Sequence, residues 1–345
     1  MRATFLFGAG DVRVIDVPDP KLRDATDAIV RVVLTCVCGS DITQFRTMPD
    51  AAIGRSMGHE FVGVVEEIGA HVRTLNVGDF VIAPLVWADG VCEFCLAGLH
   101  TSCRRGGRWN DENCGGCQAE LVRVPFADGT LVRAEVDESS ALVPSLLAVS
   151  DVYGTGYHAA HMARVGPSTS VCVIGDGAVG LMAVMSARQL GAERIILMTG
   201  RQGRAALGRS FGASDIVASR GDEAVSTVAE LTGGVGTNVV IEAVGSTAAF
   251  EQALGLVRDG GTISQIGVPS SPGHLESFTN AFTRNLTLTG GLAPTRAYTE
   301  RLMAHILDGG ADPGRVFDLE VPLDDIGEGY RAMDDRRAMK AAVRP

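Results

Sequence analysis

Cysteines form the densest cluster of chemically reactive side chains in the sequence. Five of the eight cysteines lie between Cys92 and Cys117. The first residues are apolar over too short a stretch for a secretory signal, so we expect a reducing, cytoplasmic setting. Clustered cysteines there favour metal binding over disulfides. Cys36 and Cys172 lie in apolar runs, which favours positions in the core.

A glycine-rich segment carries a second chemical pattern. Residues 171–180 read V-C-V-I-G-D-G-A-V-G, so a G-x-G-x-x-G motif lies between a predicted strand and a predicted helix. Gly175 makes the tight turn, Gly177 lets a pyrophosphate approach the backbone, and Gly180 lets the helix pack on the strand. The N–H groups of the helix start, at Ala178 and Val179, then face the anion. The motif predicts a dinucleotide site, the alternative being a plain strand-to-helix turn.

The residues about twenty positions further on indicate which dinucleotide is bound. NAD-binding folds usually have Asp or Glu there to hold the ribose hydroxyls, whereas this chain has Thr199, Gly200 and Arg201. Arg201 can bind a 2′-phosphate, with Arg204 one turn away. We therefore expect NADP to be preferred over NAD, and we also assign Val268 to the cofactor site. The alternative is that Arg201 is a solvated surface charge.

The surrounding sequence predicts the elements that must position these residues. Residues 1–150 contain short strand-like segments broken by Gly, Pro and Asp, for example 28–34, 61–68 and 79–83. From residue 170, apolar strand-like runs alternate with helical periods, which predicts right-handed crossovers and a parallel sheet. The expected strands are 171–175, 194–198, 216–218, 238–244, 262–266 and 286–289, and the expected helices are 178–190, 204–211, 222–231, 247–257 and 299–307.

Composition narrows the class of protein. A chain of 345 residues with 46% hydrophobic and 21% charged residues is typical of a two-domain globular enzyme. Its net charge of −11 argues against binding to nucleic acid or an anionic membrane. No run of about 18 apolar residues predicts a transmembrane helix.

Several motifs together resemble one family. Residues 58–63 read G-H-E-F-V-G with Gly69 six residues later, residues 38–41 read C-G-S-D, and residues 77–81 read V-G-D-F-V. With the cysteine cluster and the glycine loop, they resemble the zinc-containing medium-chain alcohol dehydrogenases over essentially the whole chain. The resemblance implies an α/β protein: a Gly-rich, GroES-like catalytic domain (1–150 and 291–345) and a doubly wound Rossmann cofactor domain (151–290).

The resemblance also implies a catalytic zinc site. Its ligands would be Cys38, His59 and Asp151, the last because 150–158 resembles bacterial NADP-linked secondary-alcohol dehydrogenases. Such a set leaves one position open for substrate or water. Asp41 would accept the second ring N–H of His59, and Glu60 would be a nearby carboxylate able to approach the zinc.

The proton route is the one part of this pattern in which the chain departs from the family. Ser40 matches the residue whose hydroxyl takes the substrate proton. Members often pass the proton to a His three residues later, but this chain has Thr43, which cannot carry a proton near neutral pH. We expect the onward route to use water or the cofactor ribose.

The family's structural zinc lobe resembles the cysteine cluster. Alignment on Gly98 makes Cys92, Cys95 and Cys103 three of its ligands and places Asp89 where the first cysteine should be. A carboxylate can complete a tetrahedral zinc site. The alternatives are that Asp89 is an ordinary turn residue, or that Cys114 or Cys117 replaces it; we expect those two thiols to be unligated.

The combined expectation is a zinc-dependent oxidoreductase. It would move a hydride between a small primary or secondary alcohol, or its carbonyl product, and NADP(H), as a homodimer or homotetramer. Polyol, sugar or amino-alcohol dehydrogenases of the same family remain open, as does a zinc-free quinone or enoyl reductase. Trp87 and Trp109 are assigned equally to the pocket wall and to the core.

Overall fold

The chain forms two compact units. The computed structural model describes residues 1–111, 114–269 and 275–345. One unit comprises Met1–Gly154 and Pro294–Pro345, and the other comprises Thr155–Ala293. In the part of the chain that the structure describes, no helix is long and apolar enough to cross a membrane.

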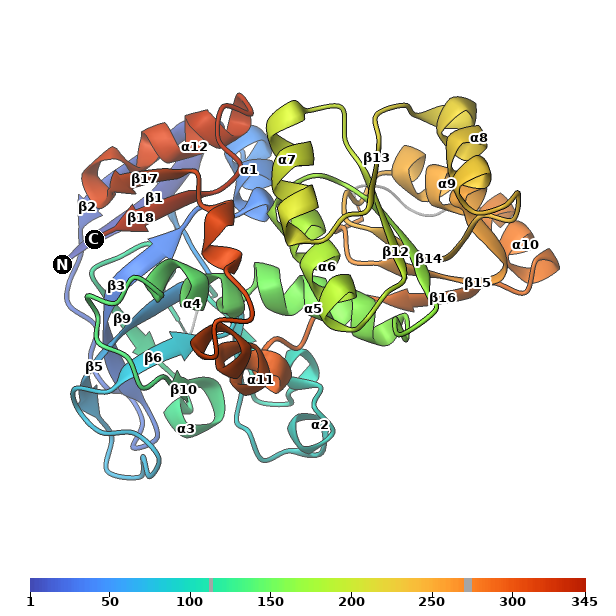
Figure 1. Cartoon of the computed structure of the whole chain (residues 1–345). Helices are drawn as coiled ribbons and strands as arrows, with labels where there is room; N and C mark the ends of the chain where they lie inside the picture. Colours follow the sequence, from blue (N-terminus) through green and yellow to red (C-terminus); the bar gives the residue numbers. More distant parts are fainter. Residues whose placement is uncertain (112–113, 270–274) are drawn as a thin grey trace. The chain divides into compact units, whose positions relative to one another are not determined.

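The first unit is built mainly on antiparallel strands, and its strands β17 and β18 pair in parallel (Figure 1). Its main sheet has the order β10-β6-β5-β3-β18-β17, with β9 also paired to β3, and a smaller sheet has the order β2-β1-β4. The strands are β1 (Arg2–Gly8), β2 (Asp11–Asp16), β3 (Ala28–Cys36), β4 (Arg55–Ser56), β5 (Phe61–Ile68), β6 (Phe80–Ala83), β7 (Val86–Trp87), β8 (Gly107–Arg108), β9 (Leu121–Val124), β10 (Val132–Arg133), β17 (Leu319–Pro322) and β18 (Ala341–Arg344). The C-terminal strand β18 pairs with β3, so the end of the chain completes this sheet.

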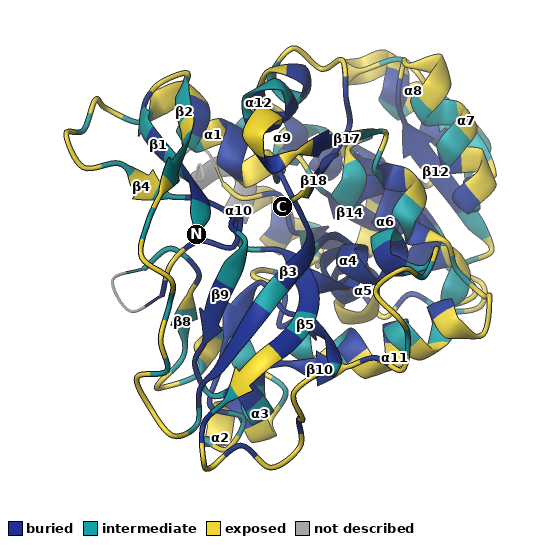
Figure 2. Cartoon of the chain, turned by 90° about the vertical axis from the view of Figure 1, so that its left-hand side faces the viewer, coloured by how far each residue is buried: buried dark blue, intermediate teal, exposed yellow. Residues whose placement is uncertain are grey.

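Helices cover and connect these strands. They are α1 (Gly39–Thr47), α2 (Glu93–Leu96), α3 (Ala127–Thr130), α4 (Val143–Ser150), α11 (Arg296–Leu307) and α12 (Ile326–Asp334), while α5 (Val152–Met162) begins in this unit and ends in the other. Strands β3 and β9 are mostly buried, as the dark blue ribbon in Figure 2 shows. Their side chains join a core that contains Phe61, Trp87 and Trp109.

The second unit is a parallel α/β sheet, as predicted. Its strand order is β13-β12-β11-β14-β15-β16, and all neighbouring pairs are parallel. The order reverses beside β11, which is the arrangement that places ligands at the carboxyl ends of the central strands. The elements are β11 (Ser170–Ile174), α6 (Ala178–Gln189), β12 (Arg194–Met198), α7 (Gln202–Phe211), β13 (Asp215–Val217), α8 (Gly221–Leu231), β14 (Thr237–Glu242), α9 (Thr247–Leu256), β15 (Val257–Gln265), α10 (Leu275–Thr283) and β16 (Thr287–Gly290).

The register of this sheet aligns the ends of its central strands. Ile174 at the end of β11 lies opposite Met198 of β12 and Glu242 of β14. The loops after these strands therefore emerge at one edge, where the glycine-rich turn also lies. Alternate apolar side chains of these strands, including Cys172 and Ile196, lie on one face of the sheet and pack with α8 and α9 in a core of this unit.

Candidate metal centres and cofactor site

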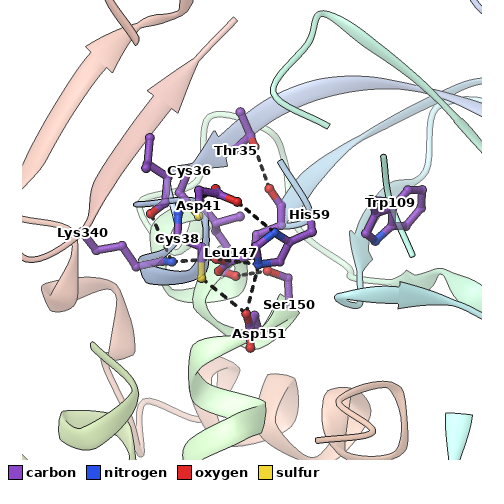
Figure 3. Close-up of polar contacts among 12 residues, drawn as sticks. Thr35, Cys36, Cys38, Asp41, His59, Trp109, Leu147, Ser150, Asp151 and Lys340 are labelled. Carbon is purple, nitrogen blue, oxygen red and sulfur yellow. Dashed lines mark hydrogen bonds and ion pairs between the residues drawn. The ribbon is translucent and has the colours of Figure 1, made fainter. Parts of the chain in front are cut away.

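The first donor cluster lies within the first unit. Cys38, His59, Glu60 and Asp151 each offer a ligand atom, and these atoms all lie within 4.8 Å of one another. His59 Nε2 is 3.4 Å from Asp151 Oδ2, and Cys38 Sγ is 3.8 Å from the same oxygen (Figure 3). In a tetrahedral zinc site with bonds of about 2.0–2.3 Å, neighbouring donors lie roughly 3.3–3.8 Å apart. The expected ligands therefore have the spacing that zinc requires.

Each donor is held by a helix end or a strand start. Cys38 is the N-cap of α1, and its backbone N–H donates to Asp41 Oδ2 at 3.0 Å, which closes the first turn. His59 immediately precedes β5, and Asp151 lies at the junction between α4 and α5. The Ser150 carbonyl accepts hydrogen bonds from Leu85 N–H and the Thr295 hydroxyl, which fixes the backbone beside Asp151.

Asp41 lies beside the other nitrogen of the His59 ring. Its Oδ1 is 3.5 Å from His59 Nδ1, and its Oδ2 accepts from Gln118 Nε2 at 3.2 Å. Gln118 in turn accepts a hydrogen bond from the Tyr330 hydroxyl at 2.9 Å. This arrangement directs Nε2 towards Cys38 and Asp151. Sequence reasoning missed Gln118 and Tyr330, because nothing in their local sequence marks them.

Glu60 is paired with a buried lysine that the sequence did not single out. Lys340 Nζ lies 2.7 Å from Glu60 Oε1, and both side chains are at most 2% exposed. His59 Nε2 is 3.9 Å from the same carboxylate oxygen, so Glu60 lies between the lysine and the donor cluster. Because Lys340 precedes β18, the C-terminal segment supplies the counter-charge for this site.

The chemistry of the cluster fits a divalent cation. Burial lowers the pKa of His59, but the neighbouring Cys38, Asp41 and Asp151 outweigh it and raise that pKa well above its usual value. Glu60 Oε2 is buried and accepts no hydrogen bond from the described residues. Negative charge is thus concentrated around one imidazole, as a Zn²⁺ site would require.

Ser40 and Thr43 occupy the exposed side of α1. Both are exposed, while Asp41 and Ile42 between them are buried. Their spacing of three residues places them on the same face of the helix. The exposed Ser40 hydroxyl is therefore free of the packing that holds Asp41 and is accessible to a small molecule.

The second donor cluster is the cysteine lobe. The ligand atoms of Asp89, Cys92, Cys95 and Cys103 lie within 4.8 Å of one another. Cys92 Sγ is 3.6 Å from Cys95 Sγ and 3.8 Å from Cys103 Sγ, too far for a disulfide of about 2.05 Å. Zn–S bonds of about 2.3 Å in a tetrahedron place sulfurs roughly 3.8 Å apart. This lobe therefore also fits a zinc ion.

Asp89 organises the turn that carries these cysteines. Its Oδ1 accepts the N–H groups of Val91 and Cys92, both at 2.9 Å, and its Oδ2 accepts from Arg105 Nε at 2.9 Å. Burial raises the pKa of Asp89, but these donors outweigh it and lower the pKa well below its usual value. The carboxylate is thus ionised and faces the sulfurs, as a ligand must.

The remaining cysteines and the tryptophans belong to the core. Cys114 and Cys117 are buried and belong to neither donor cluster among the described residues. Burial raises the pKa of Cys114 to about 12, and its thiol donates to the Arg123 carbonyl at 3.1 Å. Trp87 and Trp109 pack in the core of the first unit; Trp109 donates to the Pro84 carbonyl and lies apart from the polar cluster in Figure 3.

The glycine-rich turn has the geometry that a pyrophosphate needs. Gly175 has φ +115°, a conformation in which other residues are strained. A Cβ on Gly180 would lie 1.9 Å from the Gly175 carbonyl oxygen, so the helix packs directly on the turn. At Gly177, the N-cap of α6, a Cβ would meet nothing within 4 Å. This open space beside the N–H groups of Ala178 and Val179 can receive an anion.

The end of β12 places the predicted adenosine-side residues next to this turn. A Cβ on Gly200 would meet only the Ala218 carbonyl oxygen within 4 Å, which leaves space beside the strand end. The Thr199 hydroxyl donates to Asp176 Oδ2 at 2.7 Å, and Arg201 Nη1 lies 3.9 Å from Asp176 Oδ1. The sequence has no acid directly after β12. Asp176, the acid that lies beside Arg201, was not predicted because it belongs to the glycine motif.

Val268 and Glu242 lie on the loops after the neighbouring strands. Val268 is 73% exposed after β15, so it is available to a ligand. Glu242, which the sequence did not single out, is buried; its carboxylate accepts the N–H groups of Val244 and Gly245 at 2.7 and 2.9 Å. Burial raises the pKa of Glu242 despite these donors. This carboxyl group fixes the loop that follows β14.

The sequence of the chain is similar to those of known protein families. Residues 24–134 match the family model of the alcohol dehydrogenase GroES-like domain, and residues 178–308 match that of zinc-binding dehydrogenases. Zinc-type alcohol dehydrogenase B of Aspergillus flavus is 32% identical over 350 residues, covering 99% of this chain and 80% of the relative. An alcohol dehydrogenase of Cupriavidus necator is 30% identical over 370 residues, covering 100% of this chain and 99% of the relative.

A solved structure is similar to this chain in fold and sequence. Alcohol dehydrogenase TADH from Thermus sp. ATN1 is 33% identical, with a TM-score of 0.90 over 100% of this chain and 99% of that one. The GroES-like and Rossmann-type domains predicted from the sequence are thereby confirmed. The chain belongs to the zinc-dependent medium-chain alcohol dehydrogenase family, and is an oxidoreductase.

Proposed function

We propose that the protein interconverts a small primary or secondary alcohol with its aldehyde or ketone, using NADP(H) in preference to NAD(H). The observation that carries the proposal is the donor cluster Cys38, His59 and Asp151, with its two anionic ligands and one imidazole. Three protein ligands leave a fourth position for the substrate oxygen.

The residues of the first unit then have distinct tasks. Zn²⁺ bound by these donors would polarise the substrate oxygen, and the nicotinamide ring would exchange the hydride. Ser40 Oγ accepts the hydroxyl proton of the alcohol. Asp41 holds the His59 ring so that Nε2 faces the ligand cluster. Glu60, paired with Lys340, supplies a carboxylate that can approach the ion.

The route beyond Ser40 differs from that of relatives with a His at the next position. Thr43 is exposed on the same face of α1, and its hydroxyl can hydrogen-bond but does not ionise near neutral pH. We therefore expect the proton to pass from Ser40 to water. Thr43→Ala should then reduce turnover by less than about threefold, whereas Ser40→Ala should reduce it by about a hundredfold or more.

The test of the zinc assignment uses Asp151→Asn. The substitution keeps the side-chain size but removes one anionic donor, so the catalytic zinc should be lost while the fold persists. Zinc content, circular dichroism and turnover on a panel of alcohols and ketones are measured together; the panel also includes polyols, sugars and amino alcohols. Full turnover by the metal-free wild type would overturn the proposal.

The cofactor preference rests on Arg201. A charge-assisted contact with a 2′-phosphate contributes about 1.5–3 kcal/mol, or roughly ten- to a hundredfold in affinity. Arg201→Ala should remove most of the difference in kcat/KM between NADP and NAD. Arg209→Ala, a charge removed from the same helix at its last turn, is the matched control and should leave the preference intact. Equal kcat/KM values in the wild type would contradict the proposal.

The oligomeric state and the cellular location remain predictions. We expect a homodimer or homotetramer, which sedimentation analysis can test, and a cytoplasmic location.

A further inference from the structure

Asp176 joins the glycine-rich turn to the end of β12. Its Oδ2 accepts the Thr199 hydroxyl at 2.7 Å, while its Oδ1 lies 3.9 Å from Arg201 Nη1. The Asp176 carbonyl accepts a hydrogen bond from Arg204 Nη1 at 3.4 Å. The carboxylate therefore stands between the two segments that the fold uses for the pyrophosphate and the adenosine ribose.

The position of this acid follows from the sheet. β11 and β12 are parallel, and their last residues Ile174 and Met198 are paired, so the residues that follow both strands lie at the same edge. Asp176 comes two residues after β11, and Arg201 comes three residues after β12. The two side chains meet because of the fold, although 25 positions separate them in the sequence (201 − 176).

The contact is partly open to solvent. The Asp176 and Arg201 side chains are 25% and 44% exposed, so their attraction is moderate and the guanidinium can be reached from solvent. A phosphate that binds Arg201 meets a second anion already next to it. Thr199, by contrast, keeps the carboxylate in place, since its hydroxyl donates directly to it.

We propose that Asp176 is a specificity-determining residue: its carboxylate competes with the 2′-phosphate of NADP for Arg201 and so limits the preference for NADP over NAD. This inference rests on the proposed role of Arg201 in binding NADP. The cofactor preference then depends on Asp176 in the glycine motif as well as on the residues that follow β12.

The test measures binding without the reaction. Asp176→Asn keeps an acceptor for the Thr199 hydroxyl but removes the charge. The dissociation constants of 2′,5′-ADP and 5′-ADP are measured by calorimetry for the wild type and for variants with a melting temperature close to that of the wild type. We expect the variant to bind 2′,5′-ADP about tenfold more tightly, the low end for a charge-assisted contact, and 5′-ADP within about twofold of the wild type.

Two controls isolate the mechanism. Glu193→Gln removes an exposed acid at the opposite end of β12 and should leave both dissociation constants unchanged, which excludes an effect of net charge. In the Arg201→Ala background, Asp176→Asn should no longer tighten 2′,5′-ADP binding, because the competition has been removed.

The outcomes separate the two proposals. If Arg201→Ala weakens 2′,5′-ADP binding but Asp176→Asn leaves it unchanged, the competition is wrong and the role of Arg201 stands. A tenfold gain that persists without Arg201 would likewise overturn the competition. If Arg201→Ala changes neither dissociation constant, the NADP assignment itself fails.

Discussion

Variants of Asp89 in the cysteine lobe can distinguish a metal ligand from a residue that only stabilises the turn. Asp89 does two things in the structure: it accepts two backbone N–H groups through Oδ1, and it faces three thiols. Asp89→Asn retains a carbonyl acceptor for those N–H groups but loses the anionic donor. Asp89→Ala loses both. The two variants therefore divide the structural role from the metal-binding role.

The magnitudes follow from the contacts. Asp89→Ala leaves two N–H groups without their acceptor at about 1 kcal/mol each, the low end because the turn is near solvent. The Arg105 contact adds little, since Arg105 is 59% exposed. In the chelated protein the melting temperature should fall by roughly 4–8 °C, at about 2–4 °C per kcal/mol, and with zinc present the loss of zinc-linked stability should add to this fall. Asp89→Asn should lose only the stability that zinc binding contributes, which is about 1.4 kcal/mol for each tenfold loss in zinc affinity.

The assay is calorimetric melting with zinc and with a chelator, together with zinc content. We expect about two zinc ions per wild-type chain and about one in Asp89→Asn, whose melting temperature should match that of the wild type once both are chelated. Cys95→Ala is the positive control. It should lose the zinc of the cysteine lobe, and its melting temperature should fall while its turnover changes much less. If Asp89→Asn keeps both zinc ions and the full zinc-dependent shift, Asp89 is only a turn residue.

Three further predictions concern packing and charge. Lys340→Met should lower the free energy of unfolding by about 3–5 kcal/mol, because it leaves the Glu60 carboxylate buried without a partner; adding Glu60→Gln should restore much of it in denaturant titrations. Gly180→Ala should abolish cofactor binding measured by calorimetry, since its Cβ would collide with a backbone carbonyl, whereas Gly203→Ala, in open space on α7, should not. Burial lowers the pKa of His158, so the unfolded chain binds this proton first as the pH falls below about 6.5. Stability should therefore decrease from pH 7 to pH 5, and less steeply in His158→Gln; equal melting profiles for the two proteins would refute this.

The sequence predicted those elements that have one buried face or a clear apolar run. β5 and β12 have the bounds predicted from the sequence, and α6 differs by one residue at its end. α4 and α5 were missed because residues 143–150 and 152–160 are buried on nearly all sides. A helix surrounded by core has no polar face, so its sequence has no amphipathic period to detect.

Apart from Cys38, His59 and Asp151, which the family resemblance brought together, the site was predictable only where a motif lies within one segment of the sequence. The cysteine lobe is compact in sequence, and the glycine motif fixes its own turn. Lys340 and Gln118 had no such signal: each reaches the first donor cluster from a segment far from Cys38 and His59. Asp176 was hidden for the opposite reason, because a residue between two glycines is usually interpreted only as part of the turn.

The two donor clusters should respond differently to loss of their ions. The lobe's donors lie within residues 89–103, and backbone N–H groups already hold the Asp89 carboxylate. Its ion therefore closes a local loop, which links that ion to local stability. The donors of the other cluster come from residues 38, 59 and 151, which β3, β5 and the α4–α5 junction hold through core packing. Because core packing anchors these elements, removal of that ion should abolish turnover while the first unit stays folded.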